Sequence, residues 1–589
     1  MPRATKFLVR KLAGRNGEVD ATAIGDNELA ELQNWYNFEG ELRRRGGLTK
    51  VTSSSAWSGQ TVNSMFAYKV RSGVWKLLVG GDTKLGFLSG NAIQDVPIVG
   101  ASAFTSSTIP MKFNQYKDIV YVCRTQMGTL YRTDALSIAA AGISPPTTAA
   151  VLAEGGSGDL AAGNYIGVVT FYNSATGAES NPSPVSNTLA LSASKEIDWS
   201  SIPVSTNPQV DSRRIYRTLV DQQGEYYEVT TISDNVTTTL TEDVLQVDMG
   251  DPVSFDNGLP PDICKVAEVF TERLWISDGV DLFFSEFGLP ENFSEFSVIQ
   301  VSPDDGHSIN GLLAYGNVLL VGKTNAVHYI IGADESDFEL KMLDDTAGVV
   351  SHESMRTAKG LAFWFGGNNF YEFNGNSVEP IGDDKVRDLI STIDPDYYSK
   401  VVGAIDTTNR WYIAAIPANG SSTITHHLVY DYKQKIWSTF TWTNSAPHTL
   451  EDFFNSSGSR VLYCSAQDGN LYKYNDGTTD DGTAIACRFD TKKFGFDRDD
   501  VLKIVRETYV HGNSVDGTAN ARLLVDDVDQ GAVSFSTASA AGAWKTANTS
   551  SKSAPGEYVQ LRVDYSGVPE WRVKGYGMKV VDLNRKRIA

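Results

Sequence analysis

Short apolar runs separated by Gly, Asn and Asp turns recur along most of the chain and predict an all-β protein. The runs are rich in aromatic and β-branched residues, as is typical of strands. Two clear copies are GLLAYGNVLLVGK from Gly311 and GLAFWFGGNNFYEFNG from Gly360. Only residues 28–34 and 384–392 show helical periodicity, and both segments are short. We therefore expect many short strands and almost no helix.

The copies recur at a nearly constant spacing. Five points that we take as equivalent are separated by 43, 49, 50 and 50 residues, namely Val269, Leu312, Leu361, Trp411 and Val461. A repeat of this length matches a blade of three or four strands. Two earlier copies begin near Met65 and Phe113, 48 residues apart. The spacing predicts a β-propeller of six or seven blades.

One interval breaks the period and predicts an inserted domain. Phe113 and Val269 lie 156 residues apart, and removing residues 145–256 leaves 44, one normal blade. The removed segment opens with a Pro-Pro turn and contains alternating strands such as GNYIGVVTFY from Gly163. Strands of this kind within about a hundred residues fit a two-sheet sandwich that resembles a fibronectin type III domain. We expect the insertion to lie between strands of one blade.

The pattern changes again from Cys487, where longer strands follow one another around a Ser/Ala/Gly/Thr-rich loop at 534–553. This part predicts a second, jelly-roll-like β-sandwich. The expected domains are a lead-in with a short helix, the first blades, the insert, the remaining blades and the C-terminal sandwich, spanning residues 1–50, 51–144, 145–256, 257–486 and 487–589.

Composition and charge narrow the function classes. The 589 residues carry a formal charge of −20, which argues against a general nucleic-acid binder, although both chain ends are locally basic. The four cysteines, at 123, 264, 464 and 487, show neither zinc-ribbon nor disulfide-scaffold spacing and are expected to be reduced core thiols. No secretory signal or membrane span is recognisable. We expect the chain to be made in the cytoplasm and to lack a membrane span.

The lead-in segment combines apolar, glycine and arginine positions. Leu29, Leu32 and Trp35 recur at helical spacing and predict a short helix packed on a blade. We expect Gly40, Gly46 and Gly47 to permit the turn into the first strand. Three consecutive arginines cannot all face one core, so at least one should meet solvent or a carboxylate across an interface. The candidate interface residues are Trp35, Arg43, Arg44 and Arg45; ordinary helix-to-strand packing is the alternative for this segment.

The same segment, ELAELQNWYNFEGELRRRGGL from Glu28, resembles the N-terminal signature of tail nozzle proteins of short-tailed phages, also called tail tubular or stabilisation proteins. The positions that carry the resemblance are Asn34, Trp35, Gly40, Leu42, Arg43, Arg45 and Gly46. The segment PDDGHSINGLLAYGNVLLV from Pro303 is similar to a blade opening of that family.

The resemblance implies a structural virion protein that forms a homohexameric ring in the phage tail. Such a ring continues the DNA channel below the portal and the head-to-tail adaptor, and it carries a needle, fibre or spike below. Viral DNA would pass through during ejection without specific binding. A lumen lined by acidic subunits would repel phosphate and let DNA slide, which is a hypothesis about the sign of the field.

No catalytic or cofactor-binding constellation stands out, so we predict a protein that is not an enzyme and binds no cofactor. SPDDGHS from Ser302 imitates part of the sialidase Asp-box, but an Asp/Gly turn explains it. His426 and His427 point to opposite faces of a strand and make a poor metal pair. The acidic turns at 476–481 and 526–529 could hold Ca²⁺, yet such turns are more often solvated.

The alternative function is a carbohydrate-binding or glycan-cleaving propeller, in which the insert would assist binding to surfaces. Trp364, Trp411 and Trp437 could then stack on sugar rings. Their spacing within strands favours core packing instead.

Overall fold

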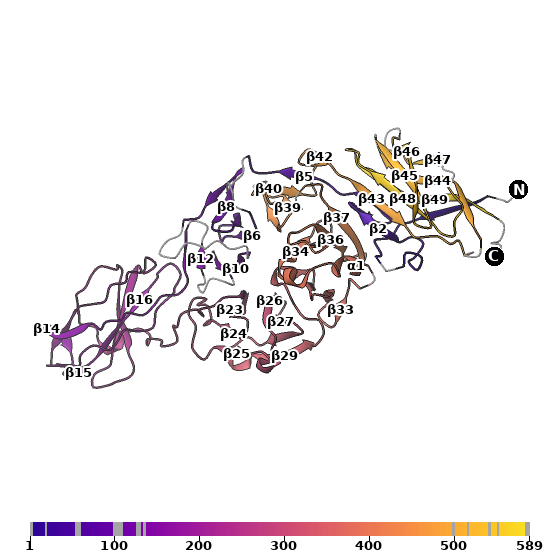
Figure 1. Cartoon of the computed structure of the whole chain (residues 1–589). Coiled ribbons are helices and arrows are strands. Elements are labelled where there is room, and N and C mark those ends of the chain that lie inside the picture. The colour runs from indigo at the N-terminus through magenta and orange to yellow at the C-terminus, as the bar shows by residue number, and fades with distance from the viewer. Residues whose placement is uncertain are drawn as a thin grey trace.

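The computed structural model describes all residues except 1–3, 18–19, 54–60, 98–109, 125–130, 134–136, 384, 445, 456, 498–500, 515–516, 540–542, 551–552 and 584–589. The chain is an all-β protein in which three parts lie roughly in line (Figure 1). The inserted domain lies at one end, the β-propeller in the middle, and a β-sandwich at the other end, beside both chain termini.

Within the described residues, seven antiparallel sheets form the blades of the propeller. Their first strands, together with the 3₁₀ turn η4 (His352–Ser354) between the fourth and fifth blades, contact one another in a closed ring, and residues from all seven blades line a central channel. The first five blades are β6 (Ser64–Lys69), β7 (Trp75–Gly80), β8 (Leu85–Ser89) and β9 (Ala92–Asp95); β10 (Lys112–Tyr116), β11 (Ile119–Cys123), β12 (Tyr131–Thr133) and β13 (Ile138–Ala140); β22 (Val266–Phe270), β23 (Arg273–Ser277), β24 (Asp281–Phe284) and β25 (Val298–Gln300); β26 (Ile309–Tyr315), β27 (Val318–Lys323), β28 (Val327–Ile331) and β29 (Glu339–Asp344); and β30 (Arg356–Ala358), β31 (Leu361–Phe365), β32 (Phe370–Phe373) and β33 (Val378–Pro380).

The seventh blade is closed by a strand from the start of the chain. The sixth blade is β34 (Val402–Asp406), β35 (Trp411–Ile416), β36 (His426–Asp431) and β37 (Ile436–Thr441). The seventh takes β38 (Leu450–Phe454), β39 (Arg460–Ser465) and β40 (Leu471–Tyr474) from the C-terminal side and β5 (Leu48–Lys50) as its fourth strand. The ring therefore depends on pairing between residues more than 400 positions apart.

Each blade is apolar on both faces because it lies between two neighbours. In β31, for example, Phe363 packs toward the sixth blade and Trp364 toward the fourth. In β27, Leu319 and Leu320 likewise enter different inter-blade cores. Successive strand residues point to opposite faces, so a strand buried on both sides reads as a continuous apolar run. This explains runs such as VLLV and FWF.

The observed blades refine the predicted period. Val269 and Leu312 lie on innermost strands, whereas Leu361, Trp411 and Val461 lie on second strands, so the five points were not equivalent. The innermost strands of the last five blades begin at Val266, Ile309, Arg356, Val402 and Leu450, which lie 43 to 48 residues apart.

Within the predicted insert, residues 145–256, two small sheets pack around a core of their own. One sheet contains β14 (Val151–Leu160), β18 (Lys195–Ser200) and β21 (Leu240–Glu242), the other β16 (Gly167–Tyr172), β19 (Ser212–Arg217) and β20 (Tyr227–Ile232), and β15 (Gly163–Tyr165) pairs with β17 (Leu189–Leu191). Trp199 and Ile197 from the first sheet meet Val169 and Ile215 from the second. The fibronectin type III likeness of this domain stays a prediction.

The position of the insert corrects one expectation. It follows β13, the outermost strand of the second blade, and precedes β22, the innermost strand of the third, so it lies between two blades and not between strands of one blade. The crossover between blades already runs over the surface, where added chain disturbs no sheet. Asn292 of the third blade donates hydrogen bonds to Asn257 (2.6 Å) and to the Glu179 carbonyl (3.3 Å), which join the insert to the propeller.

The third part is a two-sheet sandwich built from both ends of the chain. Its sheets contain β1 (Thr5–Arg10), β3 (Trp35–Phe38), β4 (Glu41–Arg44), β44 (Lys503–Ser514), β47 (Lys545–Ser550) and β49 (Trp571–Asp582), and then β2 (Leu29–Gln33), β43 (Cys487–Thr491), β45 (Thr518–Val525), β46 (Val528–Ser536) and β48 (Val559–Tyr565). The lead-in is thus not a separate domain, because its strands β1 to β4 belong to the C-terminal sandwich and β5 belongs to the propeller. A jelly-roll topology stays a prediction.

The helix expected at residues 28–34 is wrong, because this segment is strand β2. Its pairing with β43 shifts register between Leu29 and Glu31, which marks a β-bulge. The extra residue lets Leu29 and Leu32 face the same core, and Asn34 turns the chain in the left-handed region (φ 61°) before Trp35. A bulged strand therefore imitated helical spacing.

Helices are few and short in the described part of the chain. They are α1 (Arg387–Ile390), within the segment expected to be helical, and the 3₁₀ turns η1 (Gln246–Asp248), η2 (Pro303–Asp305), η3 (Glu335–Asp337), η4 (His352–Ser354) and η5 (Pro395–Lys400). None of these could cross a membrane. All four cysteines are buried, as expected for core residues.

Candidate functional site

The four candidate interface residues lie at the joint between propeller and sandwich, on β3, on β4 and directly after it. Trp35 is fully buried in the sandwich core, with its ring centroid 5.5 Å from that of Trp571. The Arg44 guanidinium is also buried and donates to the carbonyls of Thr478 and Val568, at 2.9 Å each. These two residues join parts of one chain, so a direct contact with a neighbouring subunit is contradicted by their burial.

Arg45 is the centre of this joint. Its guanidinium makes a bidentate ion pair with Asp480, at 2.8 and 2.6 Å, and donates to Asn34 Oδ1 and to the Thr441 carbonyl. Both members of the pair are nearly inaccessible to solvent. The side chain thereby links the lead-in, the last strand of the sixth blade and the segment after the seventh. Because its side chain is buried, Arg45 cannot make a direct contact with a neighbouring subunit.

Arg43 is the exception. Its side chain is 23% exposed and lies over the Phe38 ring at 3.9 Å, beside Glu41. Of the three arginines, Arg43 is the one whose side chain meets solvent. The run of three arginines predicts that at least one of them does so. An interface role for Arg43 stays a prediction.

The glycines of the lead-in act differently from what was expected. Gly40 has a positive φ of 85° and, with Glu39, makes the turn between β3 and β4. Gly46 and Gly47 instead permit close approach: a Cβ on Gly47 would lie 1.9 Å from the Thr479 carbonyl oxygen. Here the backbone of the lead-in passes directly against the chain that leaves the seventh blade.

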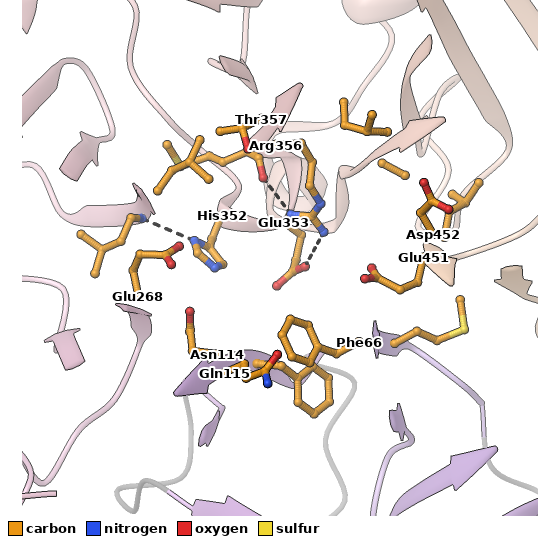
Figure 2. A pocket seen from close by; sticks show the side chains of 18 of the residues that line it. Phe66, Asn114, Gln115, Glu268, His352, Glu353, Arg356, Thr357, Glu451 and Asp452 are labelled. Carbon is orange, nitrogen blue, oxygen red and sulfur yellow. Dashed lines mark hydrogen bonds and ion pairs between the residues drawn. The ribbon is translucent and has the colours of Figure 1, made fainter. Parts of the chain in front are cut away.

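The axial channel is a cavity that sequence reasoning missed. It measures about 380 Å³ and is lined by residues from the innermost part of all seven blades. Figure 2 shows Glu268, Glu353 and Glu451 pointing into it from different sides, with Arg356 and His352 between them. No signal in the sequence marks these residues, because inner strands resemble the other strands of a blade.

The channel side chains form hydrogen bonds with backbone groups at the free edges of the inner strands. Each inner strand has one edge with no partner strand, and its polar groups need hydrogen bonds. Glu451 accepts from the Ala67 N–H of the first blade at 3.2 Å, and Asn114 of the second blade donates to the Ala267 carbonyl of the third at 2.6 Å. His352 accepts from the Leu312 N–H at 3.4 Å. The channel polar groups therefore hold neighbouring blades together.

Burial sets the charge state of these groups. It raises the pKa of both Glu268 and Glu451 to about 7 and lowers the pKa of His352 to about 4. Burial alone would also raise the pKa of Glu353, but Arg356, at 3.3 Å, and His352 lower it below its usual range. Glu353 is thus firmly ionised, whereas Glu268 and Glu451 exchange protons near neutrality; burial also raises the pKa of Asp452, a fourth carboxylate that lines the channel.

The raised pKa values of Glu268 and Glu451 predict that the stability of the protein depends on pH. The folded chain holds protons on Glu268 and Glu451 that the unfolded chain releases near pH 4.3, so stability should fall as pH rises from about 4.5 to about 7 and then level off. Gln keeps an oxygen that accepts the same N–H groups. We expect the Glu268→Gln/Glu451→Gln variant to melt higher than the wild type at pH 8, with a flatter profile between pH 5 and 8 in thermal unfolding. A variant profile parallel to the wild type would contradict this.

Other candidate groups in the sequence have structural partners. Asp305 of the Asp-box-like turn accepts from the His307 N–H (2.9 Å) and from Lys323 Nζ (2.6 Å), as a turn requires. His427 is buried between Tyr474 and the Pro447 carbonyl, away from any metal partner. In the described residues, no group of three or more His, Cys, Asp or Glu side chains is arranged to hold a metal ion.

Carboxylates of the acidic turns also have partners within the chain. Asp480 is the partner of Arg45, and Asp526 accepts the backbone N–H groups of Glu557 and Tyr558. Asp527 pairs with Lys493 at 2.7 Å. These contacts account for three of the carboxylates without a cation.

The three tryptophans proposed as sugar platforms are core residues. Trp364, Trp411 and Trp437 are at most 2% exposed. The indole N–H groups of Trp364 and Trp437 donate to the carbonyls of Ala347 and Ile381. Burial excludes stacking of a ligand on these rings.

Comparison with known proteins bears on the fold alone. No family model matches the chain, and no curated protein matches it. Solved structures similar to it include the AfRom2 CNH domain (9% identity, 72% of this chain and 98% of that one, TM-score 0.28), the Neurospora crassa Pan2 WD40 domain (8%, 73% and 94%, 0.26) and BBS1N in complex with ARL6DN (11%, 74% and 99%, 0.26). At these identities and scores the likenesses say nothing about what the chain binds.

Proposed function

We propose that this chain is a structural, non-catalytic subunit of the tail nozzle of a short-tailed phage, in which six copies form a ring. The observation that carries the proposal is the joint around Arg45. The residues on which the family resemblance rests build this joint, which ties propeller and sandwich into one body through a sheet that continues from β37 into β2. A rigid, elongated subunit suits a ring that must transmit load along a tail.

The size of the axial channel bears on where DNA would pass. About 380 Å³ holds roughly a dozen water molecules, and side chains from every blade enter it. A double helix, whose major groove alone is about 12 Å wide, does not fit. In the proposed assembly, DNA therefore passes between subunits, along a lumen that several acidic chains surround.

An apolar patch beside the insert supports self-association. Five large apolar side chains between 48% and 75% exposed lie at the end of the insert, on the linker after it and on the neighbouring loop of the third blade, namely Phe255, Leu259, Ile263, Phe287 and Phe296. The linker and the loop are joined through the bridge between Gly258 and Phe293. Exposed apolar patches of this kind mark protein interfaces. We assign this patch to contacts between copies of the chain.

Electron microscopy of the purified protein, alone and with a candidate adaptor protein, tests the proposal. We expect a six-fold ring, and native mass spectrometry should report six copies. The Phe287→Ser/Phe296→Ser variant should remove the ring while the melting temperature stays within a few degrees. The control is Val528→Ser, which changes a similarly exposed residue (62%) in the sandwich. Monomers under all conditions, with and without adaptor, would overturn the proposal.

The proposed tail partners follow from the resemblance. They are the adaptor above the ring and a needle, fibre or spike below it, and the place of the protein is the virion tail.

A further inference from the structure

A groove opens where the propeller closes, between the first and seventh blades. It measures about 900 Å³, within the range of pockets that hold small ligands, about 300 to 1,000 Å³. Its walls come from the β6–β7 and β8–β9 turns of the first blade, from β5, and from the loop after β38. We call it the closure groove.

The closure groove contains an accessible aromatic surface. Trp75 and Phe454, from opposite walls, stack with ring centroids 5.0 Å apart and planes 26° apart, and both side chains are partly exposed. Val74 beside them is 57% exposed. Unlike the core tryptophans, Trp75 is therefore available to a ligand. A flat aromatic surface of this kind packs against the apolar face of a sugar ring.

The charged side chains that line the closure groove in the described part of the chain are positive. Among the described residues, the charged lining residues of the groove are Lys50 and Lys473 and none is a carboxylate, in a chain whose net charge is −20. Neither lysine makes an ion pair within the described residues. Asp468 interacts electrostatically with Lys50, and its carboxylate already accepts from the Tyr472 hydroxyl (2.6 Å) and the Asn470 amide (2.7 Å). The groove is thus suited to an anion.

Strand addition of a peptide is disfavoured at this place. The groove wall β5 pairs with β40 along its whole length and with β41 (Thr479–Asp480) at Leu48, which leaves little of its second edge for an extended peptide. The side chains of Thr49, Asn91 and Asn455 add hydroxyl and amide groups to the lining, which suit sugar hydroxyls.

We propose that the closure groove binds an acidic oligosaccharide, with a sugar ring on Trp75 and its carboxylate, phosphate or sulfate group at Lys50 and Lys473. This binding is independent of the proposed tail function. It would give the chain a direct contact with an anionic glycan surface.

A glycan array carrying acidic oligosaccharides and their neutral counterparts tests the inference with the full-length protein. We expect binding to acidic members, at least about tenfold weaker for Trp75→Ala and for Lys473→Gln, and weaker in high salt. Trp75→Phe should restore part of the binding. Trp544→Ala and Lys574→Gln are matched controls, because these two residues form an aromatic–lysine pair in the sandwich (3.8 Å) and should leave binding unchanged.

Three results would overturn the inference. They are no acidic glycan bound, equal binding of neutral counterparts, or binding that Lys473→Gln leaves unchanged. Lys473 is half-buried at the groove wall, so its substitution should not unfold the chain. Direct binding of an acidic peptide such as oligoglutamate, with no glycan bound, would assign the groove to a protein partner instead.

Discussion

Replacing Arg45 with Met should destabilise the joint between propeller and sandwich by about 3 to 5 kcal/mol, because it leaves the Asp480 carboxylate buried without its partner. The hydrogen bonds from Arg45 to Asn34 and Thr441 are lost with it. Thermal and urea unfolding, followed by tryptophan fluorescence, should show the change as a lower midpoint. Arg45→Lys should recover only part of the loss, since one ammonium cannot reproduce a bidentate contact.

Two further variants distinguish the effect of losing the ion pair from a general loss of stability. Arg43→Ala removes the neighbouring arginine, whose side chain is partly exposed over Phe38, and should cost about 1 kcal/mol or less. Arg45→Met combined with Asp480→Leu removes both charges and should be more stable than Arg45→Met alone. If Arg45→Met were as mild as Arg43→Ala, the central role of this residue in the joint would be wrong.

Gly47→Ala should open the closure of the propeller. The added Cβ would lie 1.9 Å from the Thr479 oxygen and 2.5 Å from its carbonyl carbon, and backbone atoms cannot rotate away as a side chain does. Overpacking of side chains costs about 1 to 3 kcal/mol, and a backbone clash should reach or exceed the upper value. Because β5 begins at the next residue, the seventh blade would lose its fourth strand.

Limited proteolysis measures this opening directly. We expect Gly47→Ala to be cleaved faster within residues 455–486, where the seventh blade and its exit segment lie, and to melt at a lower temperature. Gly250→Ala is the control, because its Cβ would meet nothing nearer than the Glu228 Cβ at 3.2 Å. Equal cleavage of the two variants would show that closure tolerates the clash.

The lead-in shows how far sequence reasoning reached. The signal that marked it was real, since Trp35, the glycines and the arginines all have defined contacts. Their partners, such as Asp480 and Trp571, lie more than 400 residues away in the sequence, so the pattern could not distinguish a joint within the chain from a contact between subunits. The bulge in β2 misled the prediction of secondary structure in the same segment.

The channel and the closure groove lay beyond sequence reasoning for a different reason. Glu268 and Glu451 look like ordinary polar positions of strands, and only the ring of blades makes them neighbours of one cavity. Trp75 has no local feature that separates it from Trp364, yet one is partly exposed in a groove and the other is core. Exposure depends on which blade lies opposite, and the local pattern does not contain that information.

Period-2 and turn patterns along the chain were enough to determine an all-β propeller with an interrupted repeat and a different C-terminal part, because strand periodicity and turn residues act within about ten positions. Tertiary structure alone decided that seven blades close through β5, that the insert lies between blades, and that both chain ends share one sandwich. These features depend on pairing between distant strands, and such pairing is selected by burial over the whole molecule.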